Sequence, residues 1–144
     1  MKVAATDRLV LDASIALAWC FPDEESAASE AILDLLSAGR EAFVPVLWPL
    51  EVGNALLVAE RRKRITVAQV TSVLQRIARL PITVVPLTTG RAFGSILYLA
   101  RQEQLTEYDA AYLDLSLREG LPLATLDDDL RRAARRAGID LITS

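Results

Sequence analysis

The sequence predicts an α/β domain of three layers, in which a parallel five-stranded sheet lies between two layers of helices, as in Rossmann-like folds. Two observations predict this class. Short apolar segments alternate along the chain with longer segments of helical spacing. Strands that are apolar on both faces and joined through helices are typical of parallel sheets covered on both sides. The length of 144 residues, 52% of them hydrophobic, fits a single domain over residues 1–144.

The first half of the chain is expected to contain two strands and three main helices. Acids in residues 22–26 suit a helix N-terminus, and Thr66 is placed to cap a later helix. The predicted strands are residues 9–11, followed by a helix-like stretch, and residues 42–44. The predicted helices run from after residue 26 to Gly39, from residue 47 or 49 to about residue 63, and from Thr66 to Pro81.

The second half is expected to contain three further strands. Residues 82–86 are rich in β-branched side chains and form the clearest strand of the sequence. Threonines precede two of the helices, where they can cap the N-terminus, and glycines end two. The predicted strands are residues 82–86, 121–126 and 139–142. The predicted helices run from Thr88 or Thr89 to about residue 102, from Thr106 to Gly120, and from Asp127 to Gly138.

The composition excludes several kinds of catalytic site. The chain has no histidine and one cysteine, Cys20, so a histidine general base, a Ser-His-Asp triad and a zinc site built on histidine or clustered cysteines are all excluded. Cys20 lies in an apolar run and is expected to be a small buried residue. Polar chemistry must therefore come from carboxylates, hydroxyls, amides and arginines.

Segment and charge patterns indicate a soluble cytoplasmic protein. Residues 1–8 contain no apolar segment typical of a signal peptide, and no later run approaches the roughly 18 apolar residues of a membrane span. The net charge of −3 argues against nonspecific binding of nucleic acid through overall charge. Cations nevertheless gather in residues 61–64 and 131–136, where they contact phosphates or simply favour helix C-termini.

Two aspartates come directly after predicted strands. Asp12 follows residues 9–11, and Asp127 follows residues 121–126. Ligands of open parallel sheets bind at the carboxyl ends of the strands, so both aspartates are candidate site residues. The alternative is that each caps the helix that follows, because an aspartate at a strand-to-helix turn accepts hydrogen bonds from free backbone N–H groups.

Glu51 is the third candidate acid. Its helical neighbours, among them Leu50 and Ala55, are apolar, so the glutamate interrupts a largely apolar side of its helix. An acid that points inward must be paired, protonated or bound to a metal. Asn54, three residues on, is placed to hydrogen-bond the carboxylate. The alternative is that Glu51 only favours the helix dipole in the first turn.

Asp109 is the fourth candidate acid. Thr106 precedes it by three residues, as in a capping box, which is the alternative explanation. The residues that follow Asp109 are largely apolar, which indicates that this first turn of the helix is buried. Asp114, five residues on, faces elsewhere and is expected to be solvated.

Four carboxylates that converge imply a bound cation. Two like charges ~4 Å apart repel by about 4 kcal/mol at an effective dielectric constant near 20. Oxygen ligands select Mg²⁺ or Mn²⁺, and such a metal serves phosphoryl transfer by activating water without histidine. The hydroxyls of Ser14 and Thr125, each two residues from a candidate acid, are placed to orient the acids or the metal-bound water, or act as turn and capping groups.

Four segments of the sequence resemble the motifs of the PIN-domain ribonucleases, particularly the VapC-type toxins of toxin–antitoxin pairs. The segments are V-L-D-A-S, P-L-E-V-G-N-A-L, L-T-E-Y-D-A-A-Y-L and L-A-T-L-D-D-D-L-R-R-A-A, and they span nearly the whole chain in the family's order. By this resemblance, the metal-binding acids are Asp12, Glu51, Asp109 and Asp127, and the accompanying polar residues are Ser14, Asn54 and Thr125. Asp129 is either an extra ligand or a charge that favours a helix N-terminus.

The resemblance implies an activity and partners. It implies a Mg²⁺- or Mn²⁺-dependent endoribonuclease that cuts RNA, acts as a homodimer, and is inhibited by a cognate antitoxin laid along a groove. Two other classes stay open. One is an α/β phosphatase or phosphotransferase with Asp12 as covalent nucleophile, although position 14 is serine and the lysines are Lys2 and Lys63. The other is a non-catalytic PIN-like binding module.

Overall fold

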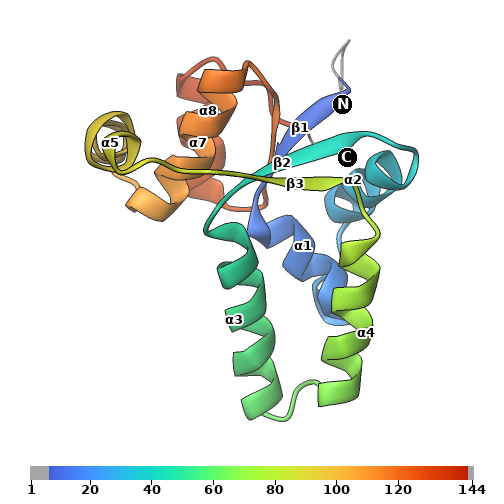
Figure 1. Cartoon of the computed structure of the whole chain (residues 1–144). Helices are drawn as coiled ribbons and strands as arrows, with labels where there is room; N and C mark the ends of the chain where they lie inside the picture. The colour runs from blue at the N-terminus through green and yellow to red at the C-terminus, as the bar shows by residue number, and fades with distance from the viewer. Residues whose placement is uncertain (1–6, 143–144) are drawn as a thin grey trace.

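Four parallel strands form the central sheet of the molecule (Figure 1). The structure is a computed structural model and describes residues 7–142. Neighbouring strands are parallel throughout, in the order β3-β2-β1-β4. The strands are β1 (Arg8–Leu11), β2 (Glu41–Pro45), β3 (Ile82–Val85) and β4 (Leu123–Ala124). The predicted α/β class with a parallel sheet between helices is confirmed.

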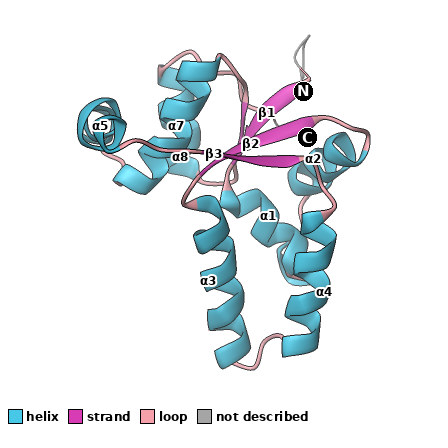
Figure 2. Ribbon diagram, in the orientation of Figure 1, coloured by secondary structure: helices cyan, strands magenta, loops and turns pink. Residues whose placement is uncertain are grey.

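Helices connect the strands and cover the sheet. The helix α7 packs directly on β1, β2 and β4, whereas α1 packs between α2 and α3. Figure 2 shows α3 and α4 as a hairpin that extends away from the sheet. The helices are α1 (Ala13–Cys20), η1 (Pro22–Glu24), α2 (Ala27–Ser37), α3 (Trp48–Arg61), α4 (Val67–Ala78), α5 (Thr89–Arg91), η2 (Ala92–Ile96), α6 (Leu97–Glu103), α7 (Glu107–Glu119) and α8 (Asp128–Arg136). Within residues 7–142, no helix has both the length and the apolar character that crossing a bilayer would require.

The fourth strand is shorter than the sequence predicted. Residues 121–126 were expected to be extended, but β4 holds two residues. At its start, the Leu121 N–H donates to the Ser116 carbonyl oxygen at the end of α7, and Pro122 has no N–H to donate. At its end, the Leu126 N–H donates to the Ser14 hydroxyl. Both ends of the segment therefore form hydrogen bonds outside the sheet.

The predicted fifth strand over residues 139–142 is wrong. Within residues 7–142, this segment pairs with the sheet through an isolated parallel bridge between Leu123 and Leu141. Two hydrogen bonds hold it there, from the Leu123 N–H to the Asp140 oxygen and from the Ile142 N–H to the Leu123 oxygen. The neighbouring strand β4 has two residues, and of these Leu123 pairs with residues 139–142. This segment therefore forms a single bridge and no further strand.

The local signals for helix ends are confirmed. Thr66 forms a capping box with Gln69, and the Thr106 hydroxyl accepts a hydrogen bond from the Asp109 N–H at 3.1 Å. Gly120 ends α7 in the left-handed conformation, with a φ of 65° that an L-residue rarely adopts. Among residues 7–142, helix α7 carries the longest run of buried residues, 110–116, and so forms the centre of the core.

Cys20 is buried, as expected. Its thiol donates a hydrogen bond to the Ala16 carbonyl oxygen at 3.2 Å. Burial raises the pKa of the thiol to about 11, and the charge of Arg76 opposes this only in part.

We expect Cys20 to react slowly with a thiol reagent in the folded protein. With a pKa of about 11 against an ordinary 9.0, the thiolate fraction at pH 8 is about 100-fold smaller than in the unfolded chain. Dithionitrobenzoate labelling at pH 8, with and without denaturing urea, measures the two rates on the same single thiol. Equal rates would show that Cys20 is accessible in the native state.

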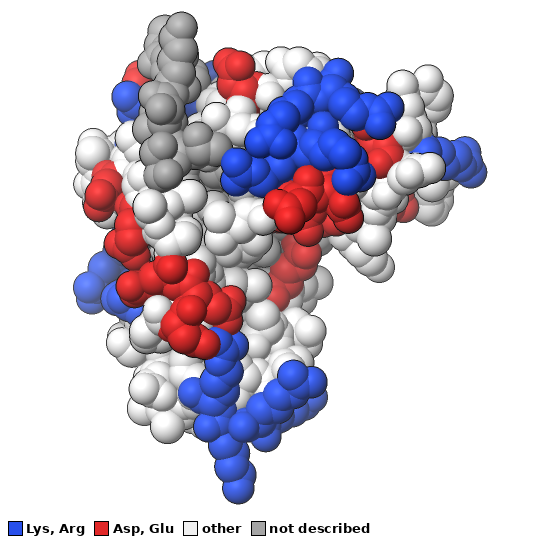
Figure 3. Space-filling model, turned by 180° about the vertical axis from the view of Figure 1, so that it is seen from behind, with Lys and Arg blue, Asp and Glu red and all other residues white. Residues whose placement is uncertain are grey.

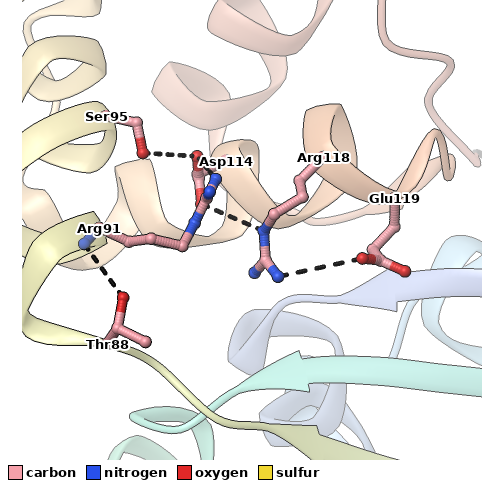
Figure 4. Close-up of polar contacts among 6 residues, drawn as sticks. All are labelled: Thr88, Arg91, Ser95, Asp114, Arg118 and Glu119. Atoms are coloured by element: carbon pink, nitrogen blue, oxygen red, sulfur yellow. Dashed lines mark hydrogen bonds and ion pairs between the residues drawn. The ribbon is translucent and has the colours of Figure 1, made fainter.

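Asp114 is not solvated as predicted but buried in an ionic cluster (Figure 4). Its carboxylate accepts hydrogen bonds from Arg91 Nη2 at 2.8 Å and Nε at 3.3 Å, and from the Ser95 hydroxyl at 3.3 Å. Arg118, one turn along α7, lies 3.8 Å away. The segment η2 packs on α7, and α5 packs on η2, so that Ser95 of η2 and Arg91 of α5 reach Asp114.

We expect Asp114→Ala to lower the free energy of unfolding by about 2 kcal/mol, because it leaves the partly buried Arg91 guanidinium without its carboxylate. Urea denaturation of both proteins measures the difference. The matched control is Arg132→Ala, which breaks an ion pair with exposed partners and should change stability by less than about 0.5 kcal/mol. Equal urea midpoints for Asp114→Ala and the wild type would contradict a stabilising role for the cluster.

Candidate active site

The carboxyl ends of β1 and β4 bring the first two candidate acids to one edge of the sheet. Asp12 follows β1, and its N–H donates to the Ala124 oxygen of β4 at 2.9 Å. Asp127 follows β4 by three residues and precedes α8. Glu51 and Asp109 lie in the first turns of α3 and α7. Four different elements therefore each supply one acid to this region.

Asp12 is a buried carboxylate held by two hydroxyls. Its side chain is 5% exposed, and Oδ2 accepts hydrogen bonds from the Ser14 hydroxyl at 2.6 Å and the Thr125 hydroxyl at 2.7 Å. Although Asp12 occupies the N-cap position of α1, its side chain makes no capping hydrogen bond. Burial raises the pKa of Asp12, and the two hydroxyls oppose this rise. The capping alternative for Asp12 is therefore wrong.

The two hydroxyls also bind the backbone that leads to Asp127. Ser14 Oγ accepts from the Leu126 N–H at 2.9 Å, and Thr125 Oγ1 accepts from the Asp127 N–H at 3.0 Å. The capping alternative is correct for Asp127, because its Oδ1 accepts from the Leu130 N–H at 2.8 Å. Its other oxygen makes no hydrogen bond to residues 7–142 and stays available to a ligand.

Glu51 is held by a partner that the sequence analysis did not identify. The Tyr112 hydroxyl donates to Glu51 Oε1 at 2.5 Å. Asn54, the predicted partner, is exposed on α3 and makes no hydrogen bond to Glu51. The expectation that Glu51 lies on a largely apolar side of its helix is only partly correct. Leu50 is 77% exposed, whereas Ala55 is half-buried. Glu51 lies at the boundary of the buried side of α3.

One sequence signal could have identified Tyr112. It lies three residues after Asp109, so both side chains project from the same side of α7. A phenol on a buried helix needs a hydrogen-bond partner, and an inward-facing glutamate needs a donor. Which acid would meet the phenol depends on how α3 packs, and no local pattern contains that information.

Burial and neighbouring negative charges raise the pKa values of three of the acids, Asp12, Glu51 and Asp109. Burial raises the pKa of Asp109 to about 6, with further contributions from the negative charges of Asp127 and Asp12. Burial also raises the pKa of Glu51, and the charges of Asp12 and Asp109 add to the shift. Glu51 and Asp109 therefore both lie within reach of the charge of Asp12.

The chemistry of the four acids suits a divalent cation, although their arrangement is not that of a formed metal site. Among residues 7–142, no three His, Cys, Asp or Glu side chains form a ready-made metal-binding group. The donors are all carboxylate oxygens, which Mg²⁺ and Mn²⁺ prefer, and their mutual repulsion favours a positive ion between them.

Basic side chains border the acids. Figure 3 shows basic groups directly beside acidic ones in the upper part of the rear face, and a second basic group at the lower end. In α8, Asp129 is 67% exposed on its side chain and binds Arg132 at 2.8 Å, and Arg131 Nη1 donates to the Thr125 oxygen at 3.3 Å. Arg64 in the other basic run is engaged by acids of the chain itself, at 2.9 Å and 2.7 Å.

Comparison with known proteins identifies the family. The protein-family model of the PIN domain matches residues 9–136, which include all four acids. The chain belongs to the PIN-domain family. PIN domains are generally nucleases, so the family indicates a nuclease. No curated protein matches the chain significantly.

Solved structures share the PIN fold of this chain. PAE2754 from Pyrobaculum aerophilum is similar with a TM-score of 0.68 and 23% identity, over 90% of this chain and 80% of that chain. VapBC2 from Rickettsia felis, bound to a DNA fragment from their promoter, is similar with a TM-score of 0.65 and 13% identity, over 93% of this chain and 96% of that chain. At these identities the similarity shows a shared fold.

We expect Asp109→Asn to stabilise the metal-free PIN domain at pH 7. The pKa of Asp109 is 3.8 ordinarily and about 6 when folded, so between these values the folded state binds a proton that the unfolded state has released. The free energy of unfolding therefore falls as pH rises from about 4 to 6. Removing the charge should recover about 1 kcal/mol at pH 7, after allowance for solvent screening of this half-buried group.

Urea denaturation in EDTA at pH 4.5 and pH 7 measures this effect. The matched control is Asp140→Asn, which neutralises an exposed acid outside the site and should change stability by less than about 0.5 kcal/mol. If Asp109→Asn is less stable than the wild type at pH 7, the carboxylates do not repel one another as described.

Proposed function

We propose that this PIN domain is a metal-dependent endoribonuclease that hydrolyses RNA phosphodiester bonds with Mg²⁺ or Mn²⁺. The observation that carries the proposal is the convergence of Asp12, Glu51, Asp109 and Asp127 from four separate elements, with the pKa of Asp109 raised to about 6. A protein gains nothing in stability from gathering uncompensated carboxylates, so a positively charged ligand accounts for the arrangement.

The acids are the proposed ligands, and the neighbouring hydroxyls orient them. When bound, the metal supplies an activated water and neutralises charge that develops on the phosphate. Ser14 and Thr125 direct Asp12, while the Leu130 N–H fixes one oxygen of Asp127 and leaves the other for the metal. This role fits hydroxyl donors, which hold a carboxylate without competing for the cation.

Asp129 is proposed as a nearby charge rather than as a ligand. Its Oδ1 is engaged by Arg132, and most of its side chain faces solvent. Its charge contributes to the raised pKa of Asp109, so it lies close enough to favour cation binding electrostatically. The arginines of α8 are proposed to contact RNA phosphates next to the metal.

The proposed biological setting is a toxin–antitoxin pair. The fold shared with the VapBC2 structure of Rickettsia felis supports a VapC-type toxin whose antitoxin inhibits it. The proposal includes a homodimer acting on RNA in the cytoplasm.

The phosphatase alternative has less support. A covalent nucleophile must reach phosphorus, but Asp12 is buried and its Oδ2 is bound by two hydroxyls. Among the described residues the lysine is Lys63, which follows the end of α3 on the extended hairpin. A non-catalytic binding module would differ from the proposed nuclease in having no activity, so a cleavage assay distinguishes the two.

We expect the purified protein to cleave RNA with Mg²⁺ or Mn²⁺ and to lose this activity in EDTA. Asp12→Asn and Asp109→Asn should each lower the cleavage rate by at least about 100-fold, because each removes a metal-binding charge. Gel analysis of end-labelled RNA measures the rate, and circular dichroism checks the fold. Asp140→Asn is the control that should cleave normally. Undiminished cleavage in EDTA or by either site variant contradicts the mechanism, and no cleavage by the wild type favours the binding module.

A further inference from the structure

Tyr112 combines complete burial with a hydroxyl that ends at the acids. Its side chain is 0% exposed, yet its oxygen lies 2.5 Å from Glu51 Oε1. The other two tyrosines, Tyr98 and Tyr108, are exposed. A phenylalanine would fill the same core position, so packing alone does not account for the hydroxyl.

The phenol hydrogen bond joins two helices that carry candidate acids. Tyr112 belongs to α7, one turn after Asp109, and Glu51 belongs to α3, 61 residues away in sequence. The relative positions of these two acids therefore depend in part on this one hydrogen bond.

Tyr112 is the donor to Glu51. An ionised carboxylate can only accept hydrogen bonds, so the phenolic O–H supplies the proton of this bond. It also engages one carboxylate oxygen and leaves the second for another ligand.

Without this donor, Glu51 would have a reason to move away. The charges of Asp12 and Asp109 repel its carboxylate, and α3 places it at the boundary with solvent. Rotation toward water would relieve both the repulsion and the cost of burial. The hydrogen bond from a rigid, fully packed side chain opposes that rotation.

We propose that Tyr112 is a positioning residue of the site, whose phenolic O–H holds the Glu51 carboxylate toward Asp12 and Asp109. This inference rests on the proposed function, in that the ligand which uses the position is a divalent metal. Hydrogen-bond partners of metal-binding carboxylates commonly affect metal affinity by about 10- to 100-fold.

The test is Mn²⁺ binding to the full chain, measured by titration calorimetry. We expect Tyr112→Phe to weaken Mn²⁺ affinity by at least about tenfold. Tyr98→Phe, which removes an exposed hydroxyl from α6, is the matched control and should bind like the wild type. Circular dichroism spectra that match the wild type establish that Tyr112→Phe is folded.

A double-mutant comparison separates positioning from packing. In a Glu51→Ala background the phenol has no carboxylate to hold, so adding Tyr112→Phe should change Mn²⁺ affinity by less than about twofold. A crystal structure of metal-free Tyr112→Phe should also show Glu51 in a different rotamer. This second measurement does not depend on metal binding.

Each outcome decides between the two proposals. Unchanged Mn²⁺ affinity in Tyr112→Phe overturns the positioning role while leaving the proposed function in place. An equal loss of affinity with and without Glu51 also overturns it, because the phenol then acts through the core. A wild type that binds no Mn²⁺ contradicts the metal-dependent function, and an unchanged Glu51 rotamer in Tyr112→Phe overturns the positioning role independently of it.

Discussion

The burial of one carboxylate, Asp12, organises this end of the molecule. A carboxylate removed from water needs hydrogen bonds, and Ser14 and Thr125 provide them. At Thr125 the chain leaves the sheet. The next two N–H groups then donate to the same hydroxyls, that of Leu126 to Ser14 and that of Asp127 to Thr125. That turn ends β4 and begins α8, so the short strand and the position of Asp127 follow from the same network.

Helix α7 connects the sheet to the other two acids, because it carries Asp109 and contacts Glu51. It packs on three strands, and its central residues are buried. On one side, Tyr112 reaches Glu51 of α3. On another, Asp114 binds Arg91 and Ser95 of the segment formed by α5 and η2. A helix fixed through both its core and its polar side chains is a rigid support, which a site that requires accurate geometry needs.

The site gathers negative charge at a location where the fold gains nothing from it. Burial and repulsion both raise the pKa of Asp109 to about 6, which is a cost to the folded protein that the proposed cation would reduce. The arginines of α8 lie on the helix that Asp127 caps, with Arg131 bonded to the Thr125 oxygen. Acidic centre and basic border therefore belong to one structural unit, which is the arrangement that the proposed metal and RNA would use.

Sequence patterns determined the features that depend on near neighbours. Helix caps at Thr66 and Thr106, the glycine that ends α7, and the acids after β1 and β4 are all defined within a few residues, because capping and strand alternation are local effects. Only the tertiary structure decided which groups meet. Glu51 lies 61 residues from its donor, and Asp12 lies 113 residues from Thr125. The burial of Asp114 and the loss of the fifth strand likewise depend on packing between distant segments, and short-range periodicity carries no information about such contacts.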